Sequence, residues 1–243
     1  MLLDSLKDIV KHTHSLGFIE MVKFIGTAAD AKIEAIDADK TVVLYGEMYQ
    51  PIADIQATVG LSRMAQLKGF IDLHDKSTVT VENEVRATVS VPTELKFDGG
   101  DGDVAIYRFM SETMANEQIK VPPFKGATWN VSLTPDKEKI DRLIKYQGVL
   151  GGFEKRFTVS TSKDTLNFSI GSGPTDRSNL PFAKGITGTL KHQWSWPLTQ
   201  VLSILKLNDS GDVKMHFSDM GAMKIDVDSG IGRYSYILPA SKA

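Results

Sequence analysis

Few residues of this sequence combine the types and the spacing that covalent chemistry requires. His12 and His14 lie two residues apart in a stretch predicted to be helical, so their side chains point in different directions and cannot share a metal ion. The chain has no cysteine, which excludes a thiol nucleophile, a thiolate metal site and a disulfide. No nucleophile elbow, nucleotide-binding loop or paired-carboxylate pattern occurs. We therefore expect no metal, no cofactor and no enzymatic activity.

Two glycine-rich segments resemble ligand loops, but turn and capping chemistry explains them better. Residues 98–103 (DGGDGD) suggest calcium superficially, yet they lack the spaced bidentate glutamate of an EF-hand, so we predict a hairpin turn. Residues 148–152 (GVLGG) follow a predicted helix instead of preceding one, which indicates a helix C-cap and not a phosphate loop.

The helices and strands that must position any functional residues are predicted to occur in the same order in both halves of the chain. Each half of the chain runs in the order helix, strands, helix, strands, judged from apolar residues at helical spacing and from period-2 alternation. In the first half, helices are predicted at 4–16 and 61–71, and strands at 21–25, 31–37, 40–48, 53–59, 77–83, 86–92 and 103–110.

The second half repeats this order. Thr134 is predicted to cap a helix that has Pro135 at its first position, and Pro197 to open a second helix. The predicted elements are helices at 135–147 and after 197, strands at 129–133, 153–161, 165–171, 188–196, 212–218, 221–227 and 232–238, and a polar loop at 172–185.

These repeats predict the domain organisation. We expect domain 1 at residues 1–111, a linker at 112–127 and domain 2 at 128–243. The linker is polar and then proline-rich, with no sustained periodicity, and its Val-Pro-Pro-Phe part is expected to be extended.

The composition of the 243 residues is that of an ordinary soluble protein, with 42% hydrophobic and 24% charged residues. No apolar run approaches the length of a membrane span, and the early acidic residue Asp4 argues against a signal peptide, so we expect a cytoplasmic protein without membrane contact. The net charge of −2 taken alone argues against a nucleic-acid-binding protein, since such proteins are usually basic.

Four segments carry a resemblance to a known family. Residues 31–48 (AKIEAIDADKTVVLYGEM) and 232–240 (GRYSYILPA) resemble a strand–turn–strand and the last strand of PCNA, and 53–71 and 164–171 (DTLNFSIG) resemble strand and helix segments of T4-type phage clamps. The whole order of elements is similar to that of the DNA sliding clamps, the ring-shaped processivity factors of DNA polymerases. By these segments the resemblance is greater to the T4-type phage clamps, although the short strand that precedes the first helix in the family is missing or vestigial here.

The resemblance implies fold and function together. It implies an α+β, two-domain clamp fold, in which each domain packs two helices on curved antiparallel sheets, and a homotrimeric ring. It further implies sequence-independent binding of double-stranded DNA, tethering of a DNA polymerase, and loading by a separate ATP-driven clamp loader, in the host cytoplasm if the protein is viral.

The family's DNA-binding residues lie on the helices that line the ring. The matching cations here are Lys7, Lys11, Arg63, Lys68, Lys139, Arg142, Lys145 and Lys206. The four predicted helices carry about +4 in total against −6 for the rest of the chain, which would give a basic lining within an acidic body. On the first helix, Lys11 should point away from the core, with Lys7 and His12 flanking it. For each cation, a solvated helix surface without a DNA role is the alternative.

Two further sites follow from the resemblance. A pocket for client peptides would use Ile36, Val43, Val121, Pro122, Phe124, Ile237, Leu238 and Pro239. The ring interface would pair the strand at 103–110 with a partner strand somewhere in 172–184 of the next subunit. For Ile36 and Val43, ordinary packing in the core is the alternative.

A rival hypothesis remains at this point. The chain could be a β-rich structural or assembly protein, such as a phage particle component, whose duplicated domains have no DNA role. Basic helices on an acidic body favour the clamp, because a scaffold has no reason for that charge pattern. A hydrolase or transferase is disfavoured because the sequence has no catalytic constellation.

Overall fold

The computed structural model describes residues 2–174, 176–209 and 211–242. The chain divides into two compact units. Unit 1 comprises Met1–Pro122 and Ser229–Tyr234, and unit 2 comprises Pro123–Asp228 and Ser235–Ala243. Unit 1 therefore includes a short segment from the C-terminal part of the chain.

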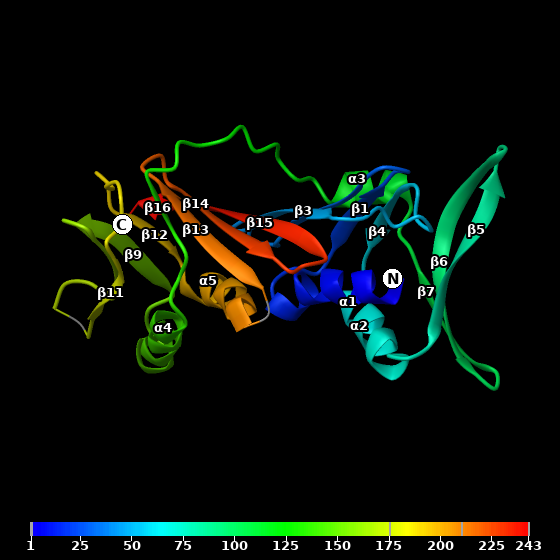
Figure 1. The fold of residues 1–243 in the computed structure, drawn as a ribbon, viewed down its shortest axis with the longest axis horizontal. Coiled ribbons are helices and arrows are strands. Elements are labelled where there is room, and N and C mark those ends of the chain that lie inside the picture. The colour runs from blue at the N-terminus through cyan, green and yellow to red at the C-terminus, as the bar shows by residue number, and fades with distance from the viewer. Residues whose placement is uncertain (1, 175, 210, 243) are drawn as a thin grey trace. The chain divides into compact units, whose positions relative to one another are not determined.

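Unit 1 combines a pair of packed helices, α1 and α2, with antiparallel strands in the orders β4-β1-β2-β3 and β5-β6-β7 (Figure 1). Its elements are α1 (Leu2–Lys11), the 3₁₀ helix η1 (His14–Leu16), β1 (Val22–Gly26), β2 (Ala31–Ile36), β3 (Val43–Met48), β4 (Thr58–Leu61), α2 (Met64–Leu73), β5 (Thr78–Arg86), β6 (Val89–Gly100), β7 (Asp103–Arg108) and α3 (Glu112–Gln118). The run predicted as a strand at 53–59 is a strand only from Thr58 onwards.

Helix α1 forms because its apolar residues recur at helical spacing and fall on one face. Leu6, Ile9 and Val10 on that face are buried. The hydroxyl of Thr13 donates a hydrogen bond of 2.6 Å to the Ile9 carbonyl. Gly17 ends the following 3₁₀ turn in the left-handed region, at a φ of 86°, which suits a residue without a Cβ.

The expectation that His12 flanks the exposed side of this helix is wrong. His12 is 1% exposed, and its ring stacks on Tyr234 with 4.2 Å between centroids. Asp8 is buried beside it and accepts hydrogen bonds from the hydroxyls of Tyr234 (2.7 Å) and Ser229 (2.9 Å). Burial opposes ionisation of Asp8, but His12 and these hydrogen bonds hold its pKa below the usual value. The network fastens α1 to residues 229–234 of unit 1.

The strands β5, β6 and β7 form a meander with two hairpin turns. The turn predicted at 98–103 is confirmed, with Gly100 opposite Asp103 in the register. β6 runs from Val89 to Gly100 and is thus much longer than the predicted run at 86–92. In the strand order, β7 stands last, so its outer edge has no paired strand among the residues that the structure describes.

The stretch expected to be a linker begins with a helix that the periodicity did not indicate. The hydroxyl of Ser111 caps α3 by accepting from the Met114 N–H, and Ala115 is buried where α3 packs on β4. Seven residues offer too few repeats for a periodic signal. The part without regular structure therefore starts only at Ile119.

Unit 2 repeats the plan, with α4 and α5 packed together and strands in the orders β15-β14-β13-β8 and β11-β10-β9-β12-β16 (Figure 1). Its elements are β8 (Val131–Leu133), α4 (Lys137–Leu150), β9 (Arg156–Ser162), β10 (Thr165–Ile170), β11 (Ser178–Lys184), β12 (Trp194–Pro197), α5 (Leu198–Leu205), the 3₁₀ helix η2 (Lys206–Asp209), β13 (Asp212–Ser218), β14 (Ala222–Asp228), β15 (Gly232–Pro239) and β16 (Ser241–Lys242). The first residues of β15 belong to unit 1.

The start of α4 differs from the prediction. The helix begins at Lys137 because Asp136 is its N-cap, with a side chain that accepts from the Glu138 N–H at 2.8 Å, so Thr134 has no capping role. Helix α5 begins after Pro197 as predicted, and it is a core helix with most of its apolar side chains buried.

The segment 172–185, predicted to be a loop, contains the strand β11. β11 pairs antiparallel with β10 and buries Leu180 and Phe182. Pro181 in its centre weakens the strand signal, since proline is tolerated mainly in edge strands, and β11 is indeed the last strand of its order. Each unit thus pairs two helices with antiparallel sheets, which confirms the predicted α+β fold class.

Candidate functional site

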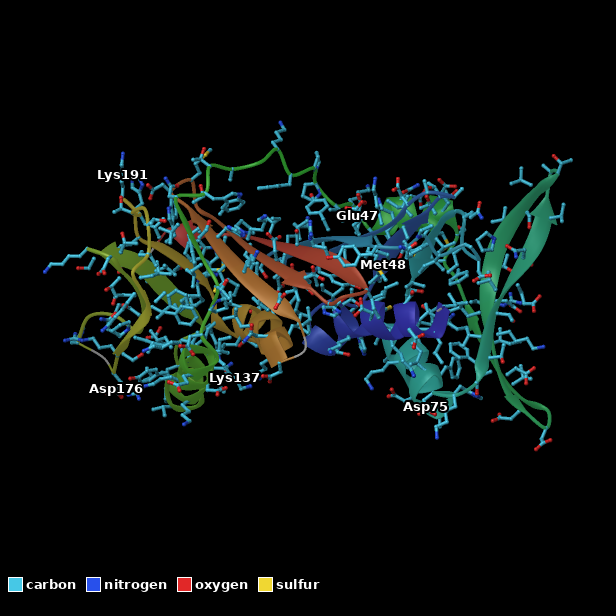
Figure 2. The ribbon with its side chains drawn as sticks, viewed as in Figure 1. Glu47, Met48, Asp75, Lys137, Asp176 and Lys191 are labelled. Carbon is cyan, nitrogen blue, oxygen red and sulfur yellow. The ribbon has the colours of Figure 1, made fainter. Side chains whose placement is uncertain are left out.

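Three of the predicted DNA-binding cations come together in unit 1. Lys7, Lys11 and Lys68 line one shallow groove formed by α1, α2 and the turns that follow them. Because α1 and α2 pack side by side, lysines that are distant in sequence reach the same surface. The groove also contains Asp72 and Asp75, and the latter lies just beyond the end of α2 (Figure 2).

Two lysines of this groove contact acidic residues that also line it. The Nζ of Lys7 donates to the carbonyl of Asp75 at 3.0 Å, and Lys68 pairs with Asp72 one turn further along α2. The exposed ion pair of Lys68 with Asp72 contributes little free energy, so Lys68 can exchange partners. The groove can therefore contact a phosphate, though its local charge is lower than the lysines alone suggest.

Arg63 lies apart from these lysines. It is the N-cap of α2 with a φ of 51°, and its guanidinium lies 5.8 Å from the ring centroid of Tyr107 and donates to the carbonyl of Arg108 at 3.4 Å. Burial raises the pKa of Tyr107, which Arg63 counteracts only in part. Arg63 is thus packed on β7 and is not part of the groove lining.

In unit 2, the predicted cations of α4 share one surface. Arg142 and Lys145 are exposed and Lys139 is half-buried, whereas Ile140 and Leu143 are buried on the other side of the helix. Their spacing of three residues keeps them along one side of the helix. Lys137 of the same helix forms an ion pair with Asp209 (Figure 2).

The observed helix bounds change the predicted charge pattern. Helices α1 and α2 are each neutral, because Asp72 falls within α2 and Arg63 lies before it. Helix α5 has no charged residue, and Lys206 is its C-cap, at the start of η2. Among these four helices, α4 has a net charge, +2 from four cations and two carboxylates. The positive charge of about +4 expected for the four helices together is therefore +2 and lies on α4.

The residues proposed for the client pocket fall into two sets, and each set belongs to one unit. In unit 1, Val43 is buried and Ile36 is half-buried at the two sides of the β2–β3 turn. The hydroxyl of Tyr45 donates to the carbonyl of Pro122, which fixes the connecting segment against β3. Val121 in that segment is half-buried.

In unit 2, the proposed pocket residues differ in accessibility. Phe124 is exposed and stacks on Trp129 with 6.1 Å between centroids, and Pro239 is exposed as well. Ile237 is 8% exposed, and Leu238 is 0% exposed, with a carbonyl that accepts from the Trp196 indole at 3.0 Å. The side chain of Leu238 is therefore a core residue and does not line a groove, contrary to the expectation.

A polar cluster on the sheet of unit 2 was not anticipated from the sequence. Nδ1 of His216 lies 2.8 Å from the Ser132 hydroxyl, and its Nε2 lies 3.3 Å from Asp226. Asp226 also contacts Lys224 (2.6 Å) and Ser235 (2.5 Å). Burial opposes ionisation of Asp226, but these three partners hold its pKa at about 2. Ser132 and Lys224 lie directly opposite His216 in the strand register, and the cluster joins the four neighbouring strands β8, β13, β14 and β15.

The described residues contain neither a membrane-spanning helix nor a cluster of metal-ligating side chains. No helix there is long and apolar enough to cross a membrane, and no group of three or more His, Asp or Glu residues is arranged to hold a metal ion.

Solved structures share this fold over nearly the whole chain. PCNA from A. fulgidus, bound to the C-terminal region of FEN-1, superposes with a TM-score of 0.71 at 11% identity, covering 99% of this chain and 96% of that chain. PCNA from Thermococcus kodakaraensis gives 0.72 at 12% identity, covering 98% of each chain. PCNA from Entamoeba histolytica gives 0.66 at 11% identity, covering 97% and 94%.

The comparisons define the class of fold. No family model matches the sequence, and no curated protein matches it. At 11–12% identity the likeness to the solved structures concerns the path of the chain. This chain has the two-domain fold of the PCNA-type DNA sliding clamps.

Proposed function

We propose that this chain is a DNA sliding clamp, a ring of three copies that encircles duplex DNA and tethers the replicative DNA polymerase. The observation that carries this proposal is the likeness to PCNA along 98% of both chains. A clamp holds its partners on DNA and performs no covalent step, so a separate ATP-driven clamp loader would place it there. The sequence resemblance to T4-type clamps suggests phage replication in a host cytoplasm as the setting.

The positions of the exposed cations support contact with DNA. Lys7, Lys11 and Lys68 gather on the helix pair of unit 1, and Lys139, Arg142 and Lys145 follow one side of α4. Lysine and arginine bind phosphates without reading the bases, as a protein that moves along any sequence requires. A modest charge on the helices favours sliding, because each contact is easily exchanged. Arg63 and Lys206 are less suited to bind phosphates, because Arg63 packs on β7 and Lys206 lies at the C-cap of α5.

Open strand edges and exposed apolar side chains support closure of a ring. β7 is last in its strand order in unit 1, and β11 is last in unit 2. Leu73, at the end of α2 beside β7, is 78% exposed, and Phe153, after α4 beside β11, is 91% exposed. Pairing β7 of one copy with β11 of the next would satisfy both edges and cover these side chains. Three copies would contribute six units.

The client pocket proposed from the sequence remains a candidate site without one of its residues, Leu238. Phe124, Ile237 and Pro239 in unit 2 and Ile36, Val43, Val121 and Pro122 in unit 1 remain candidates to receive an apolar peptide of the polymerase or the clamp loader. Leu238 is removed from the set because its side chain is fully buried.

The solution mass tests the proposal most directly. Light scattering of the purified chain over a wide concentration range should reveal a species of three times the 26.7 kDa chain mass. The trimer should also remain on circular DNA after loading and leave linear DNA through its ends. A monomer at every concentration would contradict the ring.

A further inference from the structure

A second concave surface of unit 1 lies away from the lysine groove. It is lined by the first turn of α1, by residues 48–54 after β3, and by the turn at 230–231 that precedes β15. Figure 2 labels Met48, which ends β3 and contributes to this hollow. No residue is shared with the groove of Lys7, Lys11 and Lys68.

The hollow has an apolar base and an apolar mouth. Met48 and Ile52 are buried at 5% and 6% exposure, whereas Tyr49 and Ile231 are 45% and 38% exposed. Large apolar side chains with such exposure are the residues that anchor protein contacts, because covering them removes apolar surface from water.

The walls of the hollow are held rigidly by hydrogen bonds. The N–H of Tyr49 donates to the carbonyl of Ile231 at 2.9 Å, which joins two of the three lining segments. The hydroxyl of Ser229 accepts from the N–H of Ile231 at 3.2 Å and donates to Asp8 on α1 at 2.9 Å, which joins the third. A site held in this way loses little entropy when it binds a ligand.

The charges on this surface are of one sign. Asp4 and Asp54 belong to the lining and are exposed, and the described lining contains no Lys, Arg or His. A negative rim around an apolar base attracts a ligand that is both cationic and apolar, and it repels nucleic acid. The neighbouring lysine groove has the opposite preference, so the two surfaces of unit 1 select different partners.

We propose that this hollow binds a short basic segment of a partner protein. One bulky apolar side chain of the segment occupies the space between Tyr49, Ile52 and Ile231, and flanking Lys or Arg side chains pair with Asp4 and Asp54. The site is distinct from the client pocket and from the DNA-facing helices, and it does not depend on ring formation.

A peptide-binding measurement tests the site in the full chain. The probes are fluorescently labelled hexapeptides Arg-Lys-X-Ser-Lys-Arg, with X as Phe, Trp, Met or Ser, titrated by fluorescence anisotropy. The peptides with Phe, Trp or Met should bind, and the Ser peptide should bind at least about tenfold more weakly. Ile231→Ser and Asp54→Lys should each weaken binding of the best peptide by about tenfold or more. Circular dichroism checks that both variants are folded.

A charge-matched variant separates the site from general attraction between a basic peptide and an acidic protein. Asp39→Lys makes the same charge change at the exposed β2–β3 turn, at the other end of β3 from the hollow, and should leave the affinity nearly unchanged. Equal losses for Asp39→Lys and Asp54→Lys would overturn the proposal, because the effect would then be long-range electrostatics. Equal binding of the Ser and Phe peptides, or no binding by any peptide at about 1 mM, would overturn it as well.

Discussion

At the scale of single residues, the polar cluster around Asp226 shows how ionisation is linked to the stability of unit 2. The carboxylate is 21% exposed and contacts His216, Lys224 and Ser235, which come from β13, β14 and β15. Because these contacts favour the charged form, its pKa is about 2 in the folded protein, against an ordinary value near 3.9 in an unfolded chain.

This difference predicts an acid-dependent loss of stability. A depressed folded pKa stabilises the native state above the unfolded pKa, and the contribution disappears as the pH falls from about 4 towards 2. At pH 7 the Asp226 carboxylate contributes about 2 kcal/mol to the free energy of unfolding. Asp226→Asn should lower the free energy of unfolding at pH 7, and this deficit should shrink towards pH 2. Urea unfolding followed by tryptophan fluorescence measures it, since all three tryptophans lie in unit 2.

The control is Asp212→Asn, which alters an exposed carboxylate on β13. It should change the unfolding free energy little at any of these pH values. A deficit for Asp226→Asn that is the same at pH 7 and pH 2 would contradict the assigned role of the carboxylate.

At the scale of elements, α4 is the helix best suited to contact DNA. It alone has a net positive charge among the helices described, and opposite its buried side Arg142 and Lys145 are exposed and Lys139 is half-buried. Helix α5 has the opposite role, since its apolar residues make it part of the core.

The double variant Arg142→Ala with Lys145→Ala should shorten the time that a loaded ring stays on DNA. The slope of log retention against log salt should fall by about 1 for each phosphate contact that is lost. Measurement of retention on end-blocked linear DNA at several salt concentrations tests this, with Lys191→Ala as the matched control on an exposed loop of the same unit (Figure 2). Unchanged retention would remove both residues from the DNA contact.

On the C-terminal strand, buried residues must be distinguished from exposed ones when variants are chosen to probe the client pocket. Leu238 on β15 is fully buried, and so a change to alanine should cost stability through a cavity in the core. Any effect of that variant on polymerase stimulation would reflect unfolding. Phe124 and Pro239 are exposed and are better probes of the client pocket.

At the scale of the whole molecule, the proposed assembly depends on edges that one chain leaves unpaired. β7 and β11 are terminal strands of their sheets, and each lies beside a helix with an exposed apolar residue in its last turn, Leu73 in α2 and Val149 in α4. A soluble protein with such edges normally covers them, and a closed ring covers them all.

Phe153→Asp should therefore weaken the trimer. A carboxylate in place of a side chain that is 91% exposed in the single chain should leave the fold intact and oppose burial in an interface. Sedimentation equilibrium should show a lower mass than the wild type at equal concentration. Met220→Asp changes another exposed apolar residue of unit 2 and should keep the wild-type mass. Equal masses for Phe153→Asp and the wild type would place this residue outside the interface.

The sequence predicted the order of most elements because helical and strand periodicities are local. The strands β13, β14 and β15 and the helix after Pro197 lie within a residue or two of their predicted bounds. The short helix α3 and the proline-containing strand β11 were missed, since neither has a clear period. The cations on α1, α2 and α4 could be named in advance, because a charged residue opposite an apolar stripe is normally exposed.

What the sequence alone determined is therefore the repeated α+β pattern, the absence of cysteine chemistry and the set of candidate cations. Only the tertiary structure decided which side chains meet. Burial of His12, Asp8 and Leu238, and the acidic hollow at Tyr49, all depend on segments far apart in the chain. Periodicity reports which side of an element faces a core, but partners and charge balance are set by packing between elements, which no local pattern encodes.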